Sequence, residues 1–476
     1  MEQNEWQYID SYESVYLEKM DLTEKDICKL STILKHNTSL RKLDLGDNQI
    51  CAEGATEIAN ALKHNSSLKS LNLCQNRIRG VGARNLANSL NYNNCLQELD
   101  FWGNAIIQEV QVISDALIYN SCLQILNLSL NPIGDIEAEK ISQALEYNFS
   151  LKSLNLSQTQ IGDMGATKLA QVIKHNTSLH NLYLNCSKIG DMGVEKLSEC
   201  LQYNTFLKKI NLGSNEIAHI EMGKLIDTLM YNTSLHELEL GGIEISIMAI
   251  EKLAEMLKYN TSLTALKLGY NQMTDVGVKK LARALKHNAT LKYLDLKYNR
   301  IGENSIGENG VKYLTQALKH NTSLRQLDLS LNDIDETGVK YLAKTIKQNT
   351  LHKLYLSGNG IRDIGIKILV KVLKHNTSLQ SLDLGDNKIS DMGAQELAEA
   401  LTHNTSLRKL ELRWNQIGEA GEESLIHALN QNPFVQIKLS EEIAKLCTEE
   451  GKRERMAQYI RFKQTKSAGS RTGYVQ

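Results

Sequence analysis

The sequence is informative first for what it lacks. Its 476 residues include only two prolines, so no proline-rich linker separates one part from another. No apolar run approaches the roughly 20 residues that cross a bilayer. The acidic start MEQNEWQYIDSYESVY has no apolar segment of the kind that marks a secretory signal. We therefore expect a cytoplasmic chain that has no membrane partner.

Charge of one sign is also lacking, because 54 Lys and Arg face 55 Asp and Glu. No overall field would attract nucleic acid, so no nucleic-acid partner is expected. The eight cysteines form no CxxC pair, which favours free thiols in a reducing compartment. Neither a GxxxxGK[ST] loop nor a catalytic triad stands out from the pattern. The chain is expected not to be an enzyme and to need no cofactor or metal.

What the sequence does contain is a phrase that returns along the chain. Residues 34–50 read LKHNTSLRKLDLGDNQI, and residues 373–389 read LKHNTSLQSLDLGDNKI. Fourteen units follow the pattern LxxLxLxxNxI, eleven of them with its Asn, and ten of their thirteen spacings are 28 residues. Their first leucines are Leu40, Leu68, Leu96, Leu123, Leu151, Leu179, Leu207, Leu235, Leu263, Leu291, Leu324, Leu351, Leu379 and Leu407. Such a period predicts a repeat architecture.

Each unit predicts one short strand and one helix. The LxL pair places alternate side chains inward, as in a strand, and apolar residues four apart form one buried helix stripe. We expect the Asn of HNTS to end the helix in the left-handed conformation. Parallel strands lie roughly 4.8 Å apart whereas helices need about 8–10 Å, so stacked units must curve. The predicted fold is an α/β solenoid with a parallel sheet on the concave face and helices on the convex face.

Three segments are expected from this pattern. Residues 1–16 form an N-terminal tail, and residues 17–439 form the solenoid of fourteen full repeats plus a degenerate repeat at each end. Residues 440–476 form a charged helix and a disordered basic tail. Residues 301–309 (IGENSIGEN) lengthen one unit and predict a protruding loop. The unit that begins at Leu235 has Ile243 in place of the turn Asn and is expected to be the weakest.

The unit resembles a leucine-rich repeat of the ribonuclease-inhibitor type, over nearly the whole chain. The resemblance implies a horseshoe-shaped leucine-rich-repeat solenoid. The phrase HNTSLxxLxLxxNxIGDxGxxxLAxAL is most similar to the repeats of NACHT-class nucleotide-binding leucine-rich-repeat receptors. Those receptors carry an ATPase domain before their repeats. Only about 16 residues precede the array here, so that activity does not carry over.

Two polar columns run along the repeats. A histidine position, beginning with His36 and His64, suggests metal binding, but other units place Tyr or Gln there. We favour a ring that packs beside the turn at the helix end. A column of acidic and amide residues runs from Asp44 to Glu411. It is interpreted as a solvated strand face, with cation binding as the weaker alternative.

The candidate binding site is aromatic. Tyr and Trp fall on or just after the exposed strand face, where polar residues would suffice, and these types are enriched at protein interfaces. The candidates are Trp102, Tyr183, Tyr270, Tyr293, Tyr298, Tyr355 and Trp414, together with Lys267, Lys297 and Lys353. Tyr270, Tyr293, Tyr298 and Tyr355 form the densest group. The alternative is ordinary cross-strand packing.

The function predicted from these patterns is a non-enzymatic scaffold that binds a partner protein on its concave face. The chain is expected to be a monomer, and the lysines suit an acidic or mixed partner surface. One alternative is a regulator of a small GTPase, similar to the GTPase-activating protein of Ran. That group usually has an acidic C-terminal tail, whereas this tail is basic. Another alternative is a ligand-sensing repeat module of innate signalling.

Overall fold

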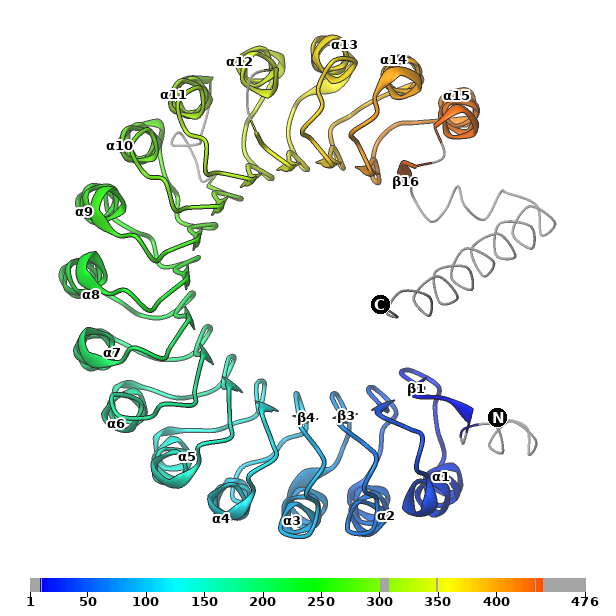
Figure 1. The fold of residues 1–476 in the computed structure, drawn as a ribbon, viewed down its shortest axis with the longest axis vertical. Coiled ribbons are helices and arrows are strands. Elements are labelled where there is room, and N and C mark those ends of the chain that lie inside the picture. Colours follow the sequence, from blue (N-terminus) through cyan, green and yellow to red (C-terminus); the bar gives the residue numbers. More distant parts are fainter. Residues whose placement is uncertain (1–8, 10, 300–307, 348–349, 433, 440–476) are drawn as a thin grey trace, which may run out of the picture. The chain divides into compact units, whose positions relative to one another are not determined.

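A computed structural model describes residues 9, 11–299, 308–347, 350–432 and 434–439. The chain divides into two compact units, Met1–Asp328 and Leu329–Gln476. Both repeat the same element, a strand of three residues followed by a helix (Figure 1). The expected loop at 301–309 and the expected C-terminal helix and tail at 440–476 lie wholly or largely outside the described residues.

The first unit contains a parallel sheet whose strands follow sequence order. The strands are β1 (Ser14–Tyr16), β2 (Lys42–Asp44), β3 (Ser70–Asn72), β4 (Glu98–Asp100), β5 (Ile125–Asn127), β6 (Ser153–Asn155), β7 (Asn181–Tyr183), β8 (Lys209–Asn211), β9 (Glu237–Glu239), β10 (Ala265–Lys267), β11 (Tyr293–Asp295) and β12 (Gln326–Asp328). Val15 pairs with Leu43, so the sheet begins before the expected boundary at Leu17.

The helices of the first unit lie on the outer side of its sheet (Figure 1). They are α1 (Glu24–His36), α2 (Ala52–Leu62), α3 (Arg79–Leu90), α4 (Val110–Tyr119), α5 (Asp135–Tyr147), α6 (Asp163–Ile173), α7 (Asp191–Tyr203), α8 (His219–Tyr231), α9 (Ile247–Tyr259), α10 (Asp275–Leu285) and α11 (Glu308–Leu318). The core lies between the two layers, where the LxL leucines such as Leu43 and Leu45 are buried.

The second unit repeats the arrangement. Its strands are β13 (Lys353–Tyr355), β14 (Ser381–Asp383), β15 (Lys409–Glu411) and β16 (Gln436–Lys438), and its helices are α12 (Glu336–Ile346), α13 (Arg362–Leu373), α14 (Asp391–His403) and α15 (Glu419–Gln431). Ile437 pairs with Leu410, so the degenerate last repeat does supply a strand. The structure thus confirms the predicted solenoid class, with a parallel sheet and covering helices.

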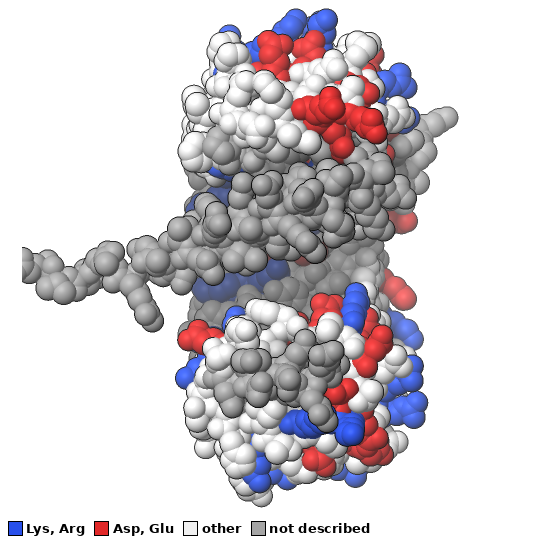
Figure 2. Space-filling model, turned by 90° about the vertical axis from the view of Figure 1, so that its right-hand side faces the viewer, with Lys and Arg blue, Asp and Glu red and all other residues white. Residues whose placement is uncertain are grey.

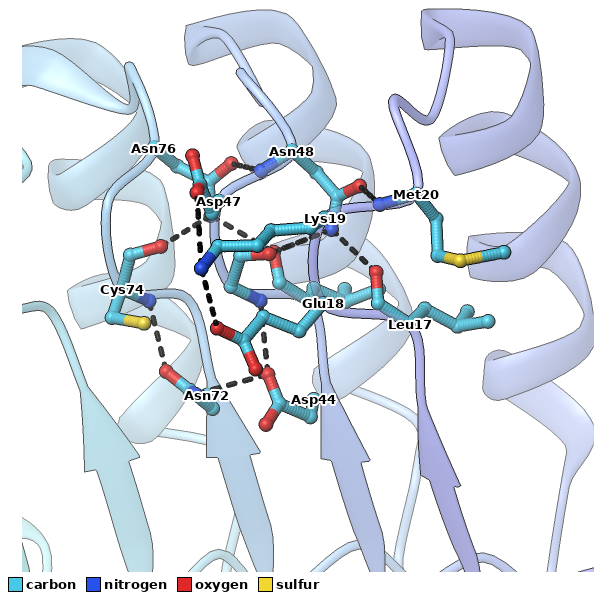
Figure 3. A network of polar contacts seen from close by, with 12 residues as sticks. Leu17, Glu18, Lys19, Met20, Asp44, Asp47, Asn48, Asn72, Cys74 and Asn76 are labelled. Atoms are coloured by element: carbon cyan, nitrogen blue, oxygen red, sulfur yellow. Dashed lines mark hydrogen bonds and ion pairs between the residues drawn. The ribbon is translucent and has the colours of Figure 1, made fainter. Parts of the chain in front are cut away.

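The turn asparagine of LxxLxLxxNxI connects one repeat to the next (Figure 3). The Asn76 amide nitrogen donates to the backbone oxygens of Leu45 and Leu73, both at 3.0 Å. Its oxygen accepts from the backbone N–H groups of Asn48 at 3.1 Å and Ile50 at 2.8 Å. The side chain therefore satisfies backbone groups that the turn would otherwise leave buried and unpaired.

A second asparagine column, in HNTS, connects the helix ends. The Asn65 amide nitrogen donates to the backbone oxygens of Leu34 at 2.6 Å and Asn37 at 3.1 Å. Its oxygen accepts from the N–H groups of Ser67 and Leu68. These buried, bonded amides explain the recurrence of Asn-x-Ser/Thr as a structural requirement of the repeat.

The expected left-handed conformation at the HNTS asparagine is wrong. Asn37 has φ −69° and ψ 134°, an extended backbone, because its side chain rather than its φ angle completes the helix end. Left-handed residues occur instead one position before the turn asparagine, as at Asp47 with φ 52°. The direction of the chain therefore changes at the end of the strand.

The unit beginning at Leu235 has no turn asparagine. Ile243 is buried, 8% exposed, and its side chain offers no oxygen to the N–H groups of Asn215 and Ile217. We expect these two amides to exchange hydrogen faster than those of Asn271 and Met273, which donate to an asparagine oxygen at 3.2 and 2.9 Å. Hydrogen–deuterium exchange measures the difference. Equal exchange rates would show that the missing turn asparagine does not weaken the local structure.

Candidate protein-binding face

The acidic and amide column on the inner face has a structural role. The Asp44 carboxylate accepts from the N–H of Gly46 at 3.0 Å, and Asn127 does the same for Ser129 at 3.1 Å. Each of these side chains closes the turn that follows its own strand. Among the described residues, no group of three or more His, Cys, Asp or Glu could hold a metal ion.

The column changes at three of the four strands β7–β10, whereas Asn211 at the end of β8 still accepts from the N–H of Gly213. Tyr183 ends β7, Glu239 ends β9 and Lys267 ends β10, where Asp or Asn would close the turn. A tyrosine or lysine cannot accept a hydrogen bond from the N–H two residues on in the way that Asp or Asn does. Tyr183 and Lys267 are therefore residues that the turn does not require.

The residues at these positions belong to a row of ion pairs and one cation–ring contact across β7–β10, called here the Lys–Glu chain. The Lys209 ammonium lies 4.8 Å from the centre of the Tyr183 ring and 2.9 Å from the Glu237 carboxylate. Lys267 lies 2.8 Å from Glu237 and 3.2 Å from Glu239. All four charged side chains are 20–29% exposed, so these ion pairs are partly shielded from water.

The pKa values of Glu237 and Lys267 depend on both burial and ion pairing. Burial alone would raise the pKa of Glu237, but the hydrogen bonds from Lys209 and Lys267 outweigh it and hold that pKa below the usual value. Burial alone would lower the pKa of Lys267, but the bond to Glu237 and the charge of Glu239 raise it. Glu237 and Lys267 are therefore both charged near neutral pH.

A hollow of about 220 Å³ lies beside these charges, at the turns that follow the strands. Three successive repeats place glycine there, Gly213, Gly241 and Gly269. A Cβ on Gly213 would come 2.7 Å from the oxygen of Gly241, and one on Gly241 would come 2.9 Å from the oxygen of Gly269. Side chains would crowd this space, so the glycines keep the hollow open, with Gly241 partly exposed and Gly213 and Gly269 buried.

Two stacked tyrosines lie at one end of the hollow. The ring centres of Tyr270 and Tyr298 are 4.6 Å apart, and the Lys297 ammonium lies 5.6 Å from the Tyr270 ring. Both tyrosines have positive φ, 61° and 49°, at a turn position where the other repeats also have positive φ, three of them with glycine and the rest with other residues. A left-handed backbone costs a residue with a side chain on the order of 1 kcal/mol. The rings are nevertheless 45% and 38% exposed.

A buried acid completes the lining. Asp295 is 4% exposed and accepts from the N–H of Lys297 at 2.8 Å. Burial raises its pKa to about 6, and the charge of Asp328 adds to the rise, while the Lys297 N–H opposes it. The carboxyl therefore titrates much closer to neutral pH than an ordinary aspartate.

The structure brings some of the predicted site residues together. Lys267, Tyr270, Tyr293 and Lys297 line the hollow, and Tyr298 stacks on Tyr270. Tyr183 joins them through Lys209 and Glu237, whereas Trp102 follows β4 and is not part of the lining. Lys353, Tyr355 and Trp414 belong to the second unit.

The second unit has its own exposed aromatic residue. Trp414 is 67% exposed, has φ 61°, and lies 5.0 Å below the Arg413 guanidinium. Arg413 binds both oxygens of Glu411, at 2.7 and 3.1 Å. Trp414 thus repeats in the second unit the left-handed, exposed aromatic residue found at the hollow.

Sequence reasoning missed several features. The glycine run and the Lys–Glu chain become visible only when residues 28 apart are compared position by position. The prediction that aromatic rings pack beside the turn at helix ends is wrong, because these tyrosines are 58–81% exposed. They are Tyr92, Tyr119, Tyr147, Tyr203, Tyr231 and Tyr259. Each stands beside the bonded Asn, which alone completes the helix end.

Family models match much of the chain. The model described as Leucine Rich repeat matches residues 36–59, 64–87, 119–142, 147–170, 175–198, 259–282 and 287–314. The chain is a leucine-rich-repeat protein. The model of the TMOD/LMOD leucine-rich domain matches residues 327–461 of this leucine-rich-repeat protein. No curated protein matches it significantly.

Two solved structures are similar to this leucine-rich-repeat protein. An internalin from Listeria monocytogenes is 20% identical, with a TM-score of 0.41, over 90% of this chain and 96% of the internalin. Leiomodin-1 actin-binding site 2 is 18% identical, with a TM-score of 0.28, over 32% of this chain and 88% of the leiomodin segment. Both TM-scores are below 0.5, so neither structure indicates what this chain binds. Among the described residues, no helix is long and apolar enough to cross a membrane.

Proposed function

We propose that this leucine-rich-repeat protein is a scaffold whose partner protein docks on the inner face of the first unit, over the hollow beside β9–β11. One observation supports this most strongly. Tyr270 and Tyr298 stack on each other and stay exposed beside the hollow, at a turn position where other repeats carry residues such as Asp, Gln, Ser or Gly. Exposed stacked rings that the turn does not require are a reason to look for a binding surface.

The lining suggests the chemistry of the partner. Stacked rings offer a flat apolar surface, and Tyr is a frequent hot-spot residue at interfaces. The Lys–Glu chain presents both signs of charge within a few ångströms, so a partner surface of mixed charge is favoured. Gly241 is partly exposed and has no side chain, which leaves room for a partner loop to come close.

Substitution of the stacked tyrosines tests the proposal. Tyr270→Asn together with Tyr298→Asn is expected to weaken partner binding by about a hundredfold, because two hot-spot rings are lost. Asn tolerates the left-handed backbone, so the fold is kept. Affinity capture with mass spectrometry first identifies the partner, and titration then measures its affinity.

The matched control is Tyr119→Asn together with Tyr231→Asn. These two tyrosines are each 81% exposed but lie at the ends of outer helices. The control is expected to bind as well as the unmodified chain, and both variants should melt near the same temperature. A correctly folded Tyr270/Tyr298 variant that binds with undiminished affinity would contradict the proposal.

Finer features belong to the same proposal. The strand-plus-helix unit of about 28 residues supports the ribonuclease-inhibitor type, and the phrase HNTSLxxLxLxxNxIGDxG supports kinship with NACHT-class repeats. We further propose a cytoplasmic monomer without catalytic activity. A GTP-hydrolysis assay with a panel of small GTPases distinguishes the scaffold from the regulator alternative, since only the regulator accelerates hydrolysis. The ligand-sensing alternative requires a partner that supplies an ATPase, which mass spectrometry of the captured proteins would reveal.

Actin is a second candidate partner, and it concerns the second unit. The observation that favours it is the match of the TMOD/LMOD family model to residues 327–461, and not the structural likeness. A leiomodin segment is by its description an actin-binding site. Cosedimentation of the purified chain with actin filaments tests this candidate. A chain that stays in the supernatant at every filament concentration excludes it.

A further inference from the structure

A groove of about 300 Å³ lies on the outer side of the first unit, between α10 and α11. Four of its lining side chains are basic, Lys279, Arg283, Lys286 and His320, and Ala282 and Ala317 are the small residues between them. None of its lining residues carries a carboxylate. The groove therefore gathers three permanent positive charges around one space without a counter-charge of its own.

Such an excess is not general among the grooves between neighbouring helices. In the second unit, a groove of about 460 Å³ between α13 and α14 is lined by Asp363, Glu396 and Glu399 as well as Lys367. On the face that Figure 2 shows, basic and acidic side chains are intermingled over the described residues. The basic lining between α10 and α11 is thus a local feature rather than a consequence of the repeat.

The basic groups differ in how they are held. The Lys279 ammonium lies 5.0 Å from the centre of the Tyr313 ring, which places it over an aromatic face that also lines the groove. Arg283 and Lys286 are exposed. A guanidinium offers two parallel N–H donors to a phosphate or carboxylate, whereas an ammonium acts as a point charge.

We propose that this groove binds a phosphorylated side chain on a partner protein. A phosphate monoester carries nearly two negative charges at neutral pH and three acceptor oxygens, so it matches three converging cations better than one carboxylate does. The alanines and the Tyr313 ring leave apolar walls for the carbon part of that side chain. The balanced charge of the whole chain disfavours nucleic acid and anionic membranes as the source of the phosphate.

Fluorescence anisotropy with the full chain tests the proposal. The probes are a labelled Gly/Ser peptide with one phosphotyrosine, the same peptide with one phosphoserine, and the unphosphorylated tyrosine peptide. At least one phosphorylated peptide is expected to bind about tenfold or more tightly than the unphosphorylated one, and more weakly as salt increases. Lys279→Ala together with Arg283→Ala is expected to abolish that preference, and Arg283→Lys should retain part of it.

The control is Lys367→Ala, which removes a lysine from the acidic groove between α13 and α14 and should leave peptide binding unchanged. Melting temperatures show that each variant is folded. Equal binding of all three peptides would overturn the proposal. It would also be overturned if phosphatidylserine vesicles or a single-stranded DNA oligonucleotide bound as tightly as the phosphopeptide and lost binding in the same double variant.

Discussion

Replacing Asn131 with alanine is expected to lower the free energy of unfolding of the first unit by about 3–5 kcal/mol. The Asn131 amide nitrogen donates to the backbone oxygens of Phe101 and Leu128, both at 3.0 Å. Its oxygen accepts from the N–H groups of Asn104 at 3.1 Å and Ile106 at 2.9 Å. The side chain is only 2% exposed, so water cannot replace these bonds without opening the repeat.

Urea denaturation of the full chain measures the loss, and two further variants test its cause. Asn131→Thr should lose less than the alanine variant, because Thr159 occupies the equivalent position two residues before Ile161 and its hydroxyl still bonds the oxygen of Leu156 at 2.8 Å. Asn60→Ala removes an exposed helix amide and should change stability by less than about 0.5 kcal/mol. Equal losses of unfolding free energy in the Asn131→Ala and Asn60→Ala variants would contradict a structural role of the buried turn asparagines.

The consequences for the array follow from its one-dimensional contacts. Each repeat of a solenoid packs on its neighbours, so a local loss is felt first in the adjacent repeats. Hydrogen exchange in the Asn131→Ala variant should therefore quicken near Leu99 and Leu126 before it quickens near Leu266. Uniform acceleration over the first unit would indicate that the repeats unfold as one cooperative body.

The repeat itself could be predicted from the sequence, because the residues that its strand, helix and turn require recur in each unit. Apolar residues at the LxL positions and four-residue apolar spacing in the helices appear fourteen times, so an error in one unit is corrected by the others. The asparagine columns were also visible. Their hydrogen bonds were not, since only the structure shows that Asn37 is extended and that Asp47 is the left-handed residue.

The candidate site could be predicted only in part, for a physical reason. Tyrosines on a strand face are conspicuous in one repeat, and Tyr270, Tyr293 and Tyr298 were found in this way. The hollow forms because successive repeats have glycine at the same position. Gly241 and Gly269 therefore indicate a hollow only when the two repeats are compared. The division after Asp328 lies far from the weak unit expected near Leu235, and no single motif marks it.

Asp295→Asn is expected to change how the stability of the chain depends on pH. In the folded chain the pKa of Asp295 is raised from 3.8 to about 6 because the carboxyl is buried. Above pH 6 the carboxyl is ionised in both states, and the folded state bears the cost of the buried charge. Below the ordinary pKa it is protonated in both states and this cost vanishes. Stability should therefore rise as pH falls from about 6 to about 4.

The size of the effect follows from the shift of about two pKa units, at about 1.4 kcal/mol each, or on the order of 3 kcal/mol. Asn should remove this pH dependence and raise stability at pH 8 by up to that amount, because its amide oxygen can still accept from the N–H of Lys297. Asn211 shows that the column admits this residue, since it accepts from the N–H of Gly213 at 3.0 Å and is 6% exposed. Urea denaturation from pH 4 to 8 measures both curves, with Asp44→Asn as the half-buried control from the same column. If the Asp295→Asn curve runs parallel to that of the unmodified chain, Asp295 does not carry a buried charge at neutral pH.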